Sequence, residues 1–150
     1  MRCLWSAVTF VVLLASCPVG QTAQANREFK DPCGGSNSNR EMWDCYASEQ
    51  ARVNAEADRL AKNIAADHLK QAMDPKYKGV VADSLRKAAS SLKLSQTSWK
   101  AYREQHCKAV EYSWTTGSGA GTAYEACMFH ISKARLQELK IDFNFQQDEE

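Results

Sequence analysis

The chain has 150 residues, and its 19 lysines and arginines nearly balance 18 aspartates and glutamates, which leaves a formal net charge of +1. Nucleic acids and anionic membranes select strongly basic surfaces, so this balance favours neither as a partner. The length allows one domain with one hydrophobic core.

The first 25 residues have the features of a signal peptide for export. Arg2 provides a positive start, residues 7–15 form an apolar run too short to span a bilayer, and residues 23–25 read Ala-Gln-Ala, which suits a signal peptidase. Cleavage before Asn26 predicts a mature domain of residues 26–150 in the periplasm or outside the cell. A second interpretation remains open, because residues 14–17 (Leu-Ala-Ser-Cys) fit a lipobox, which would anchor the protein to a membrane through lipid on Cys17.

Two long helices are predicted after an irregular lead-in at residues 26–38, which is rich in Gly, Asn, Ser and Pro. Ser38 followed by Glu41 predicts a capping box, and helical apolar spacing then runs from residue 40 to about residue 73. A turn at residues 74–79 begins with Asp-Pro, and the second helix runs from residue 80 to about residue 111. The expected inward residues of the first helix are Met42, Tyr46, Val53, Ala57, Leu60 and Ile64.

The second helix carries a stripe in alternating steps of four and three residues, which predicts one buried face. Its large aromatics, Trp99 and Tyr102, are expected to anchor a core. The stripe consists of Val81, Leu85, Ala88, Leu92, Ser95, Trp99, Tyr102 and His106. The two helices have matching lengths, so they are expected to form an antiparallel hairpin about 42 Å long.

A flexible connection is expected at residues 115–121, where glycine is frequent. Thr122 followed by Glu125 predicts a second capping box and a third helix that runs to about residue 140. The remaining residues, 141–150, are expected to form an acidic tail, in which Phe143 and Phe145 pack back on the bundle and the acidic end is disordered. The expected inward residues of the third helix are Tyr124, Cys127, Ile131, Ala134 and Leu139. The predicted fold is therefore all-α, a long antiparallel hairpin plus a third helix.

Six cysteines become four in the mature domain, and an even count in a small exported domain predicts two disulfides. The helical layout places all four at one end of the hairpin, so it excludes none of the three pairings. We favour Cys33–Cys45, which would hold the lead-in, together with Cys107–Cys127, which would clamp the glycine-rich connection.

No pattern in the chain predicts catalysis, a metal or a cofactor. His106, Cys107, Cys127 and His130 can be drawn as a zinc site, but adjacent helical residues point about 100° apart and rarely share one ion. Oxidised cysteine pairs are the commoner arrangement in exported proteins. The glycine-rich connection lacks the preceding strand and the following Lys-Ser/Thr of a phosphate-binding loop. We therefore expect a protein that is not an enzyme.

The second helix also carries a family resemblance. The pattern Gln-x-x-Trp-x-x-Tyr-Arg-x-x-x-Cys, formed by Gln96, Trp99, Tyr102, Arg103 and Cys107, resembles the LprI-like lysozyme inhibitor family of bacterial envelope proteins. Ser132 stands where that family tends to have threonine. The resemblance extends over Cys33, residues 42–45, Gly117, Ser118, Cys127, Arg135 and Leu139. Most of these positions are ones that a helical bundle needs, although Arg103 and Arg135 also fit contacts with a partner.

The resemblance implies an exported protein that binds and inhibits lysozyme and so protects peptidoglycan. Inhibition requires a protruding element that fills the glycan cleft of the enzyme, and the clamped loop at residues 115–122 is the candidate. Its expected partner-binding residues are Tyr112, Trp114, Thr116, Gly117, Ser118, Gly119 and Tyr124. The near-neutral total charge predicts little long-range attraction to a basic lysozyme. Two alternatives stay open: an immunity or binding protein against another peptidoglycan hydrolase, and a structural envelope protein with no inhibitory role.

Overall fold

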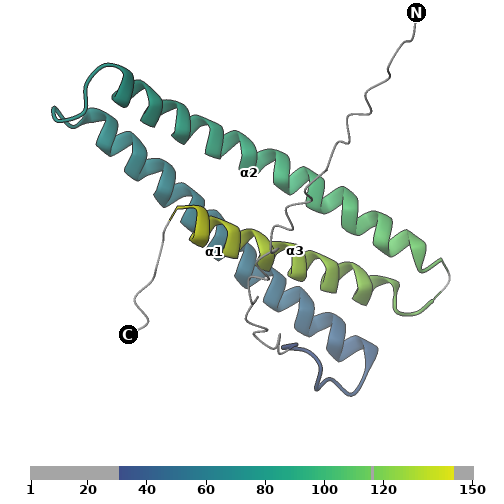
Figure 1. Ribbon diagram of the computed structural model, residues 1–150. Helices are drawn as coiled ribbons and strands as arrows, with labels where there is room; N and C mark the ends of the chain where they lie inside the picture. Colours follow the sequence, from purple (N-terminus) through teal and green to yellow (C-terminus); the bar gives the residue numbers. More distant parts are fainter. Residues whose placement is uncertain (1–30, 116, 144–150) are drawn as a thin grey trace, which may run out of the picture. The chain divides into compact units, whose positions relative to one another are not determined.

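Three helices form a bundle in the computed structural model, which describes residues 31–115 and 117–143. They are α1 (Asn39–Met73), α2 (Val80–Ser113) and α3 (Ala120–Asp142), and the described residues contain no strand. α1 and α2 form an antiparallel hairpin, and α3 turns back from the end of α2 to contact both (Figure 1). The all-α hairpin with a third helix is thereby confirmed. The predicted signal peptide, Cys17, Thr116, Phe145 and the acidic chain end lie outside the described residues.

The ends of the hairpin helices follow local sequence rules. Ser38 Oγ accepts the Glu41 N–H at 3.2 Å, and the Glu41 carboxylate accepts the Asn37 N–H at 2.9 Å, which confirms the first capping box with its return bond shifted by one residue. Asp74 has an extended backbone because Pro75 follows it. Gly79, with a φ of 58°, opens α2 in the left-handed region that glycine occupies without strain.

The second capping box is wrong, because α3 begins two residues before Thr122. Its N-cap is Gly119, which provides no side-chain cap. The Thr122 hydroxyl instead donates to the backbone oxygen of Asn39 at 3.2 Å and so ties the first turn of α3 to the first turn of α1. The helix also continues to residue 142, so the expected tail does not start at residue 141.

The core lies between the three helices and confirms most of the expected inward residues of α1. Tyr46, Val53, Ala57, Leu60 and Ile64 are buried, and Met42 packs against them from a half-buried position. α3 contributes Phe129, Leu136 and Leu139, and Phe143 packs on the same cluster as expected. The expectation for Ala134 is wrong, since its side chain is exposed on the outer side of α3.

The predicted stripe on α2 is wrong by about one residue over much of its length. Tyr102 is 58% exposed, whereas Arg103 beside it is only 7% exposed. Val81, Ser95 and His106 are likewise exposed. The buried residues of α2 are Ala82, Ala89, Leu92, Gln96, Arg103 and Cys107. A hydropathy pattern assigns Gln96 and Arg103 to solvent, but here both have hydrogen-bond partners on neighbouring helices.

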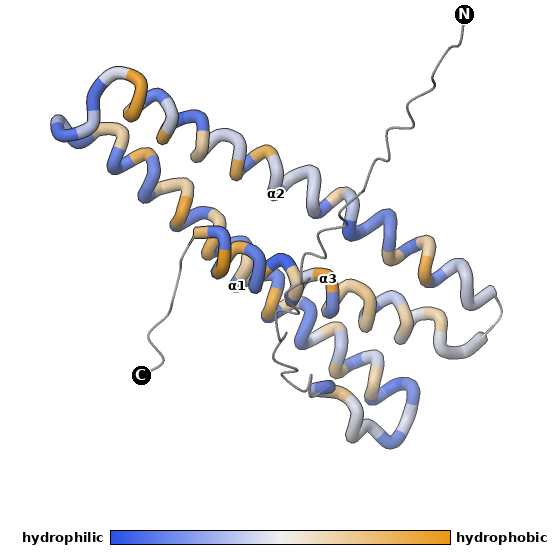
Figure 2. Tube along the Cα trace, viewed as in Figure 1, coloured by the Kyte–Doolittle hydropathy of each residue, from blue (hydrophilic) through white to orange (hydrophobic). Residues whose placement is uncertain are grey.

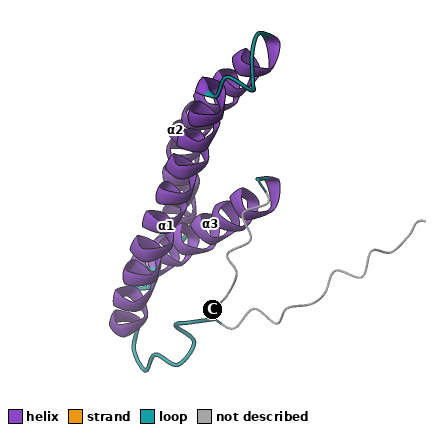
Figure 3. Cartoon of the chain, turned by 90° about the vertical axis from the view of Figure 1, so that its left-hand side faces the viewer, coloured by secondary structure: helices purple, strands orange, loops and turns teal. Residues whose placement is uncertain are grey.

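Both favoured disulfides are present. Cys33 pairs with Cys45 across a Cα–Cα distance of 5.9 Å, and Cys107 pairs with Cys127 across 5.6 Å. The first bridge fixes the irregular residues 31–38 to α1, and Asp31 adds a carboxylate that accepts the Tyr46 hydroxyl at 2.7 Å. The second bridge joins the end of α2 to the start of α3. Within the part of the chain that the structure describes, loops occur in the lead-in and at the two helix connections (Figure 3). None of the three helices carries an apolar stretch that could cross a bilayer.

Candidate functional site

Two of the motif residues, Gln96 and Arg135, join all three helices through a polar network. The Gln96 amide donates to Asp58 of α1 at 3.1 Å, and its oxygen accepts the Nε–H of Arg135 of α3 at 3.1 Å. Lys100 of α2 pairs with the same Asp58 at 2.6 Å, and Arg135 also pairs with Glu138 at 2.9 Å. The lysine and the amide hold the pKa of Asp58 below its usual value, although burial opposes the shift. Gln96 and Arg135 therefore serve to hold the three helices together.

Arg103 has a similar role deeper in the bundle. Its Nη1 donates to Asn54 of α1 at 2.6 Å and to Ser132 of α3 at 2.7 Å. The guanidinium lies over the Trp99 ring, 4.8 Å from the ring centre, and its Nε is buried without a hydrogen-bond partner. Burial lowers the pKa of Arg103. Because this side chain is enclosed by the bundle, it does not provide a surface for a partner.

Two further residues of the family resemblance, Leu139 and Tyr102, divide between core and surface. Leu139 is buried against α1, as a structural position should be. Tyr102 points away from the core, with its ring 5.5 Å from that of His106. Its expected role as a core anchor is therefore not found.

The connection between α2 and α3 is shaped by Trp114, whose ring covers the glycines that follow it. A Cβ at Gly119 would lie 3.0 Å from the ring, and one at Gly117 would lie 3.6 Å from it. Gly119 has a φ of −92°, which other residues also adopt, so its lack of a side chain serves the close approach of the ring. The glycines were expected to give flexibility, and the structure instead gives them a packing role.

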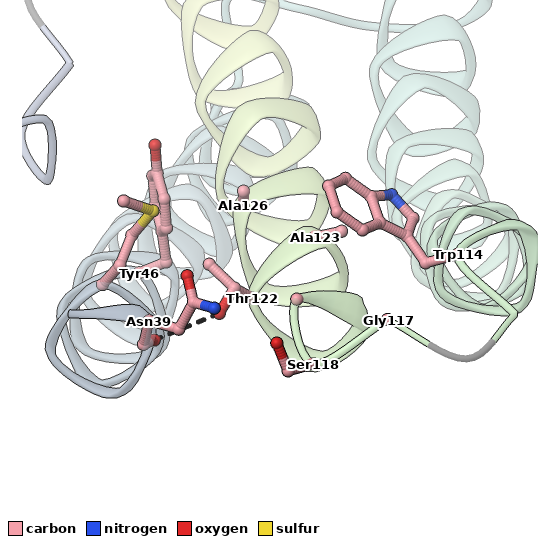
Figure 4. Close-up of a pocket in the computed structure, with 10 residues that line it drawn as sticks. Asn39, Tyr46, Trp114, Gly117, Ser118, Thr122, Ala123 and Ala126 are labelled. Atoms are coloured by element: carbon pink, nitrogen blue, oxygen red, sulfur yellow. Dashed lines mark hydrogen bonds between the residues drawn. The ribbon is translucent and has the colours of Figure 1, made fainter.

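A shallow hollow of about 410 Å³ lies beside Trp114, between the first turns of α1 and α3 (Figure 4). Trp114 and Gly117 border it on one side, Asn39 and Tyr46 on the other, and Thr122 lies between them. The hydrogen bond from Thr122 to Asn39 crosses its edge (Figure 4). The hollow is mostly apolar and open to solvent, which suits contact with a protruding side chain better than enclosure of a small molecule.

The predicted partner-binding residues lie around this connection, but they differ in availability. Tyr112 is 71% exposed and Trp114 is 51% exposed, and Gly117 and Ser118 are also exposed. Gly119 is partly covered by the Trp114 ring. Tyr124 is committed within the bundle, because its hydroxyl donates to Glu104 at 3.0 Å, and burial raises its pKa to about 12.

Thr115 is held in an unusual backbone conformation, with a φ of 45°. A β-branched residue rarely adopts the left-handed region, so the surrounding structure must hold it there. Its N–H donates to the Tyr112 carbonyl at 3.2 Å, and the Trp114 N–H donates to that of Glu111 at 3.1 Å. These bonds extend the hydrogen bonding of the last turn of α2 to Thr115, directly before the connection to α3.

Acidic side chains predominate at this end of the bundle, which we call the loop end and define as residues 31–45 and 104–127. It contains six acidic and two basic residues. The segments meet there through the Cys107–Cys127 disulfide and the Thr122–Asn39 hydrogen bond. Burial raises the pKa of Glu125, and the neighbouring Glu104 and Glu111 raise it further. The loop end therefore carries a local negative charge, although the total charge of the chain is close to zero.

Residues 31–115 and 117–143 contain no group of three or more His, Cys, Asp or Glu side chains that could hold a metal. The zinc arrangement drawn from His106, Cys107, Cys127 and His130 is ruled out in the structure because both sulfurs form a disulfide. A thiolate is the ligand that such a site would require.

Several contacts that α1 makes at these sites have no signal in the sequence. Trp43 covers Gly121, where a Cβ would lie 3.4 Å from its ring, and Arg40 lies over the same ring at 5.1 Å. Asn54 and Asp58 accept hydrogen bonds from α2. They stand between the apolar positions of an amphipathic helix, where polar residues are ordinarily solvated, so their spacing gave no signal of burial.

The sequence model of the family described as "Lysozyme inhibitor LprI" matches residues 31–139, which is most of the chain and nearly all of the described structure. No curated protein and no solved structure shows significant similarity to the chain. The family is one of inhibitors and not of enzymes. Its match starts at the lead-in held by Cys33 and ends at the buried Leu139, so it covers α1, α2 and all but the last three residues of α3. The chain therefore belongs to the LprI family of lysozyme inhibitors.

Proposed function

We propose that the protein inhibits lysozyme by placing the loop end in the glycan cleft of the enzyme. The proposal is carried by the position of the Trp114 ring, which is half exposed to solvent and is also packed over Gly117 and Gly119. Exposed aromatic anchors with a fixed orientation are the side chains that most often dominate binding energy at interfaces. Tyr112 is exposed two residues earlier and extends the same surface.

Preorganisation supports this assignment. The Cys107–Cys127 disulfide closes the connection at its base, and Thr122 ties it to α1. A loop held in this way loses little conformational entropy on docking, so more of the contact energy remains as affinity. An unrestrained seven-residue segment would lose more of that energy in ordering.

The charge of the loop end supports the choice of a basic enzyme as target. Its acidic residues, among them Glu41, Glu104 and Glu111, outnumber Arg40 and Lys108. Opposite charges on the approaching surfaces accelerate encounter, and the acceleration falls with salt. The exposed hydroxyls of Tyr112 and Ser118 can donate to the catalytic carboxylates in the cleft.

Export and processing are part of the proposal. Two disulfides require an oxidising compartment, which supports residues 1–25 as a signal peptide and a location in the periplasm or outside the cell. Mass spectrometry of the exported protein will show a chain that starts at Asn26. A chain that starts at a lipid-bearing Cys17 would instead support the lipoprotein form.

The proposal is tested by titrating chicken-type and goose-type lysozyme with exported protein that carries Cys17→Ser, so that no lipid is attached. We expect a stoichiometric loss of lysozyme activity. Trp114→Ala is expected to weaken inhibition by about 30-fold or more, the range for an aromatic anchor. The matched control is Leu94→Ala, which removes an exposed apolar side chain from the middle of α2 and is expected to change nothing. Absence of inhibition of both enzymes by the unaltered protein would refute the proposal.

A further inference from the structure

The opposite end of the hairpin exposes apolar side chains that nothing in the bundle covers. We call it the hairpin tip and define it as residues 69–87. Met73 is 76% exposed and Val80 is 82% exposed, and both Val81 and Leu69 are also exposed. In Figure 2 apolar residues at the start of α2 stand at the outer end of the hairpin. Exposed apolar residues in one small region indicate a contact surface.

α3 does not extend over this region. Phe143, which follows α3, packs on His68 of α1 with a ring distance of 5.9 Å. Only α1 and α2 continue past that level to the turn (Figure 1). The tip is therefore formed by the ends of two helices and the turn between them.

The hairpin tip is also cationic, with five basic residues against two acidic ones. Both acidic side chains are engaged locally: Asp83 pairs with Arg86 at 2.8 Å, and Asp74 accepts the backbone N–H of Lys76 at 2.8 Å. Lys76 itself lies over the Tyr77 ring at 5.3 Å. Within the described chain no ion pair engages Lys70, Lys78 or Lys87. Their ammonium groups are therefore available to an anionic partner.

We propose that the hairpin tip binds the surface of an anionic lipid bilayer. Met73, Val80 and Val81 enter the headgroup layer, and the lysines around them contact lipid phosphates. Apolar side chains surrounded by lysines are the combination that holds a protein on such a surface. The long stems of the lysines let their charges reach the phosphates while the apolar residues are immersed.

A deformable bilayer fits this tip better than a second protein. A fluid bilayer can adapt to apolar and cationic side chains spread over two helix ends and a turn, whereas two copies of a cationic tip repel one another. The formal net charge of +1 does not reveal this cationic surface, because the acidic residues of the loop end offset the basic residues of the hairpin tip. The inference does not rest on lysozyme inhibition, since it concerns the opposite end of the hairpin.

The test is co-sedimentation of the exported Cys17→Ser protein with vesicles of phosphatidylglycerol and phosphatidylcholine in equal parts, beside vesicles of phosphatidylcholine alone. We expect binding to the anionic vesicles, a marked loss at high salt, and little binding to the neutral ones. Lys70→Gln with Lys78→Gln is expected to weaken binding by about thirtyfold, at the usual contribution of a lysine near an anionic membrane. Met73→Gln with Val80→Ser is expected to weaken it by about tenfold.

The matched control is Lys93→Gln with Leu94→Ser, which removes one exposed charge and one exposed apolar side chain from the middle of α2. It should bind within about twofold of the unaltered protein, since it lies outside the tip. Equal binding to neutral vesicles, or equal losses in the control and tip variants, would overturn the proposal. So would a dimer in sedimentation velocity that the tip variants abolish, because the tip would then serve a second copy of the chain.

Discussion

Arg103 donates a hydrogen bond from Nη1 to the hydroxyl oxygen of Ser132 at 2.7 Å, and both side chains are buried between α2 and α3. The same nitrogen donates to Asn54 at 2.6 Å, so that one guanidinium connects all three helices. Its partners are neutral oxygens. Loss of the guanidinium or of its acceptors would leave buried polar groups without hydrogen-bond partners, so this arrangement is costly to disturb.

Arg103→Ala is expected to lower the free energy of unfolding by about 3–4 kcal/mol, because Asn54 and Ser132 lose their donor and the Trp99 ring loses the group stacked on it. Urea denaturation followed by far-ultraviolet circular dichroism measures the change. The control is Arg59→Ala, which removes an exposed arginine from α1 and should cost no more than about 0.5 kcal/mol. A loss below about 1 kcal/mol for the Arg103 variant would show that the buried contacts contribute little.

Gly119→Ala is expected to displace the Trp114 ring, because the new Cβ would lie 3.0 Å from it. The backbone at Gly119 has a φ of −92°, which alanine adopts readily, so the fold should be kept. The indole N–H signal of Trp114 in a ¹⁵N correlation spectrum should shift while that of Trp99 stays in place. Gly35→Ala is the control, since open space surrounds that position. Unchanged indole signals in the Gly119 variant would contradict the close packing of the ring.

Removal of the Cys107–Cys127 bridge by two serine substitutions is expected to lower the free energy of unfolding by about 3 kcal/mol on the chain-entropy model. Removal of Cys33–Cys45 should have a slightly smaller effect, because the bridge spans 12 residues instead of 20. The two variants should differ more in inhibition than in stability, since only the Cys107–Cys127 bridge closes the loop that carries Trp114. Equal inhibition of lysozyme by both variants would show that closure of this loop does not contribute to binding.

Glu125→Gln is expected to stabilise the protein at neutral pH. Burial and the neighbouring Glu104 and Glu111 raise the pKa of Glu125, so the folded state holds its proton more tightly than the unfolded state does. That contribution is present below the ordinary pKa and is lost as the pH rises through the raised value, where the carboxylate must ionise beside other acids. Because the site is partly exposed, the gain in midpoint temperature near neutrality should be about 1–2 °C. Thermal unfolding should show no gain in acid, and an equal gain at all pH values would point to another cause.

The sequence predicts the helices and the bridges because both rest on local or covalent rules. The capping box at Ser38, the break at Pro75 and the even number of cysteines in the mature domain each specify a feature without knowledge of the packing. The buried face of α2 depends instead on contacts with the other two helices. Arg103 and Gln96 are buried only because α1 and α3 supply hydrogen-bond partners, and a hydropathy pattern on one helix contains no information about those partners.

The residues of the candidate sites can likewise be recognised from the sequence only in part. Trp114 and Tyr112 are recognisable from the sequence as aromatic residues beside a clamped loop. Trp43 and the charge of the loop end are not, because they become neighbours of that loop only when α1 folds against α3. The total charge predicted weak steering toward a basic enzyme, and the folded chain separates that total into an acidic loop end and a basic hairpin tip. Salt dependence of the association rate with lysozyme therefore becomes a meaningful measurement.

The most direct test of the account is the inhibition constant for lysozyme of Trp114→Ala beside that of Leu94→Ala, both exported, oxidised and carrying Cys17→Ser. Both residues are exposed, but only Trp114 belongs to the loop end. The account predicts stoichiometric inhibition by the unaltered protein and by the Leu94 variant, with a loss of about 30-fold or more for the Trp114 variant. Equal inhibition by all three proteins, or none by any of them, would contradict it.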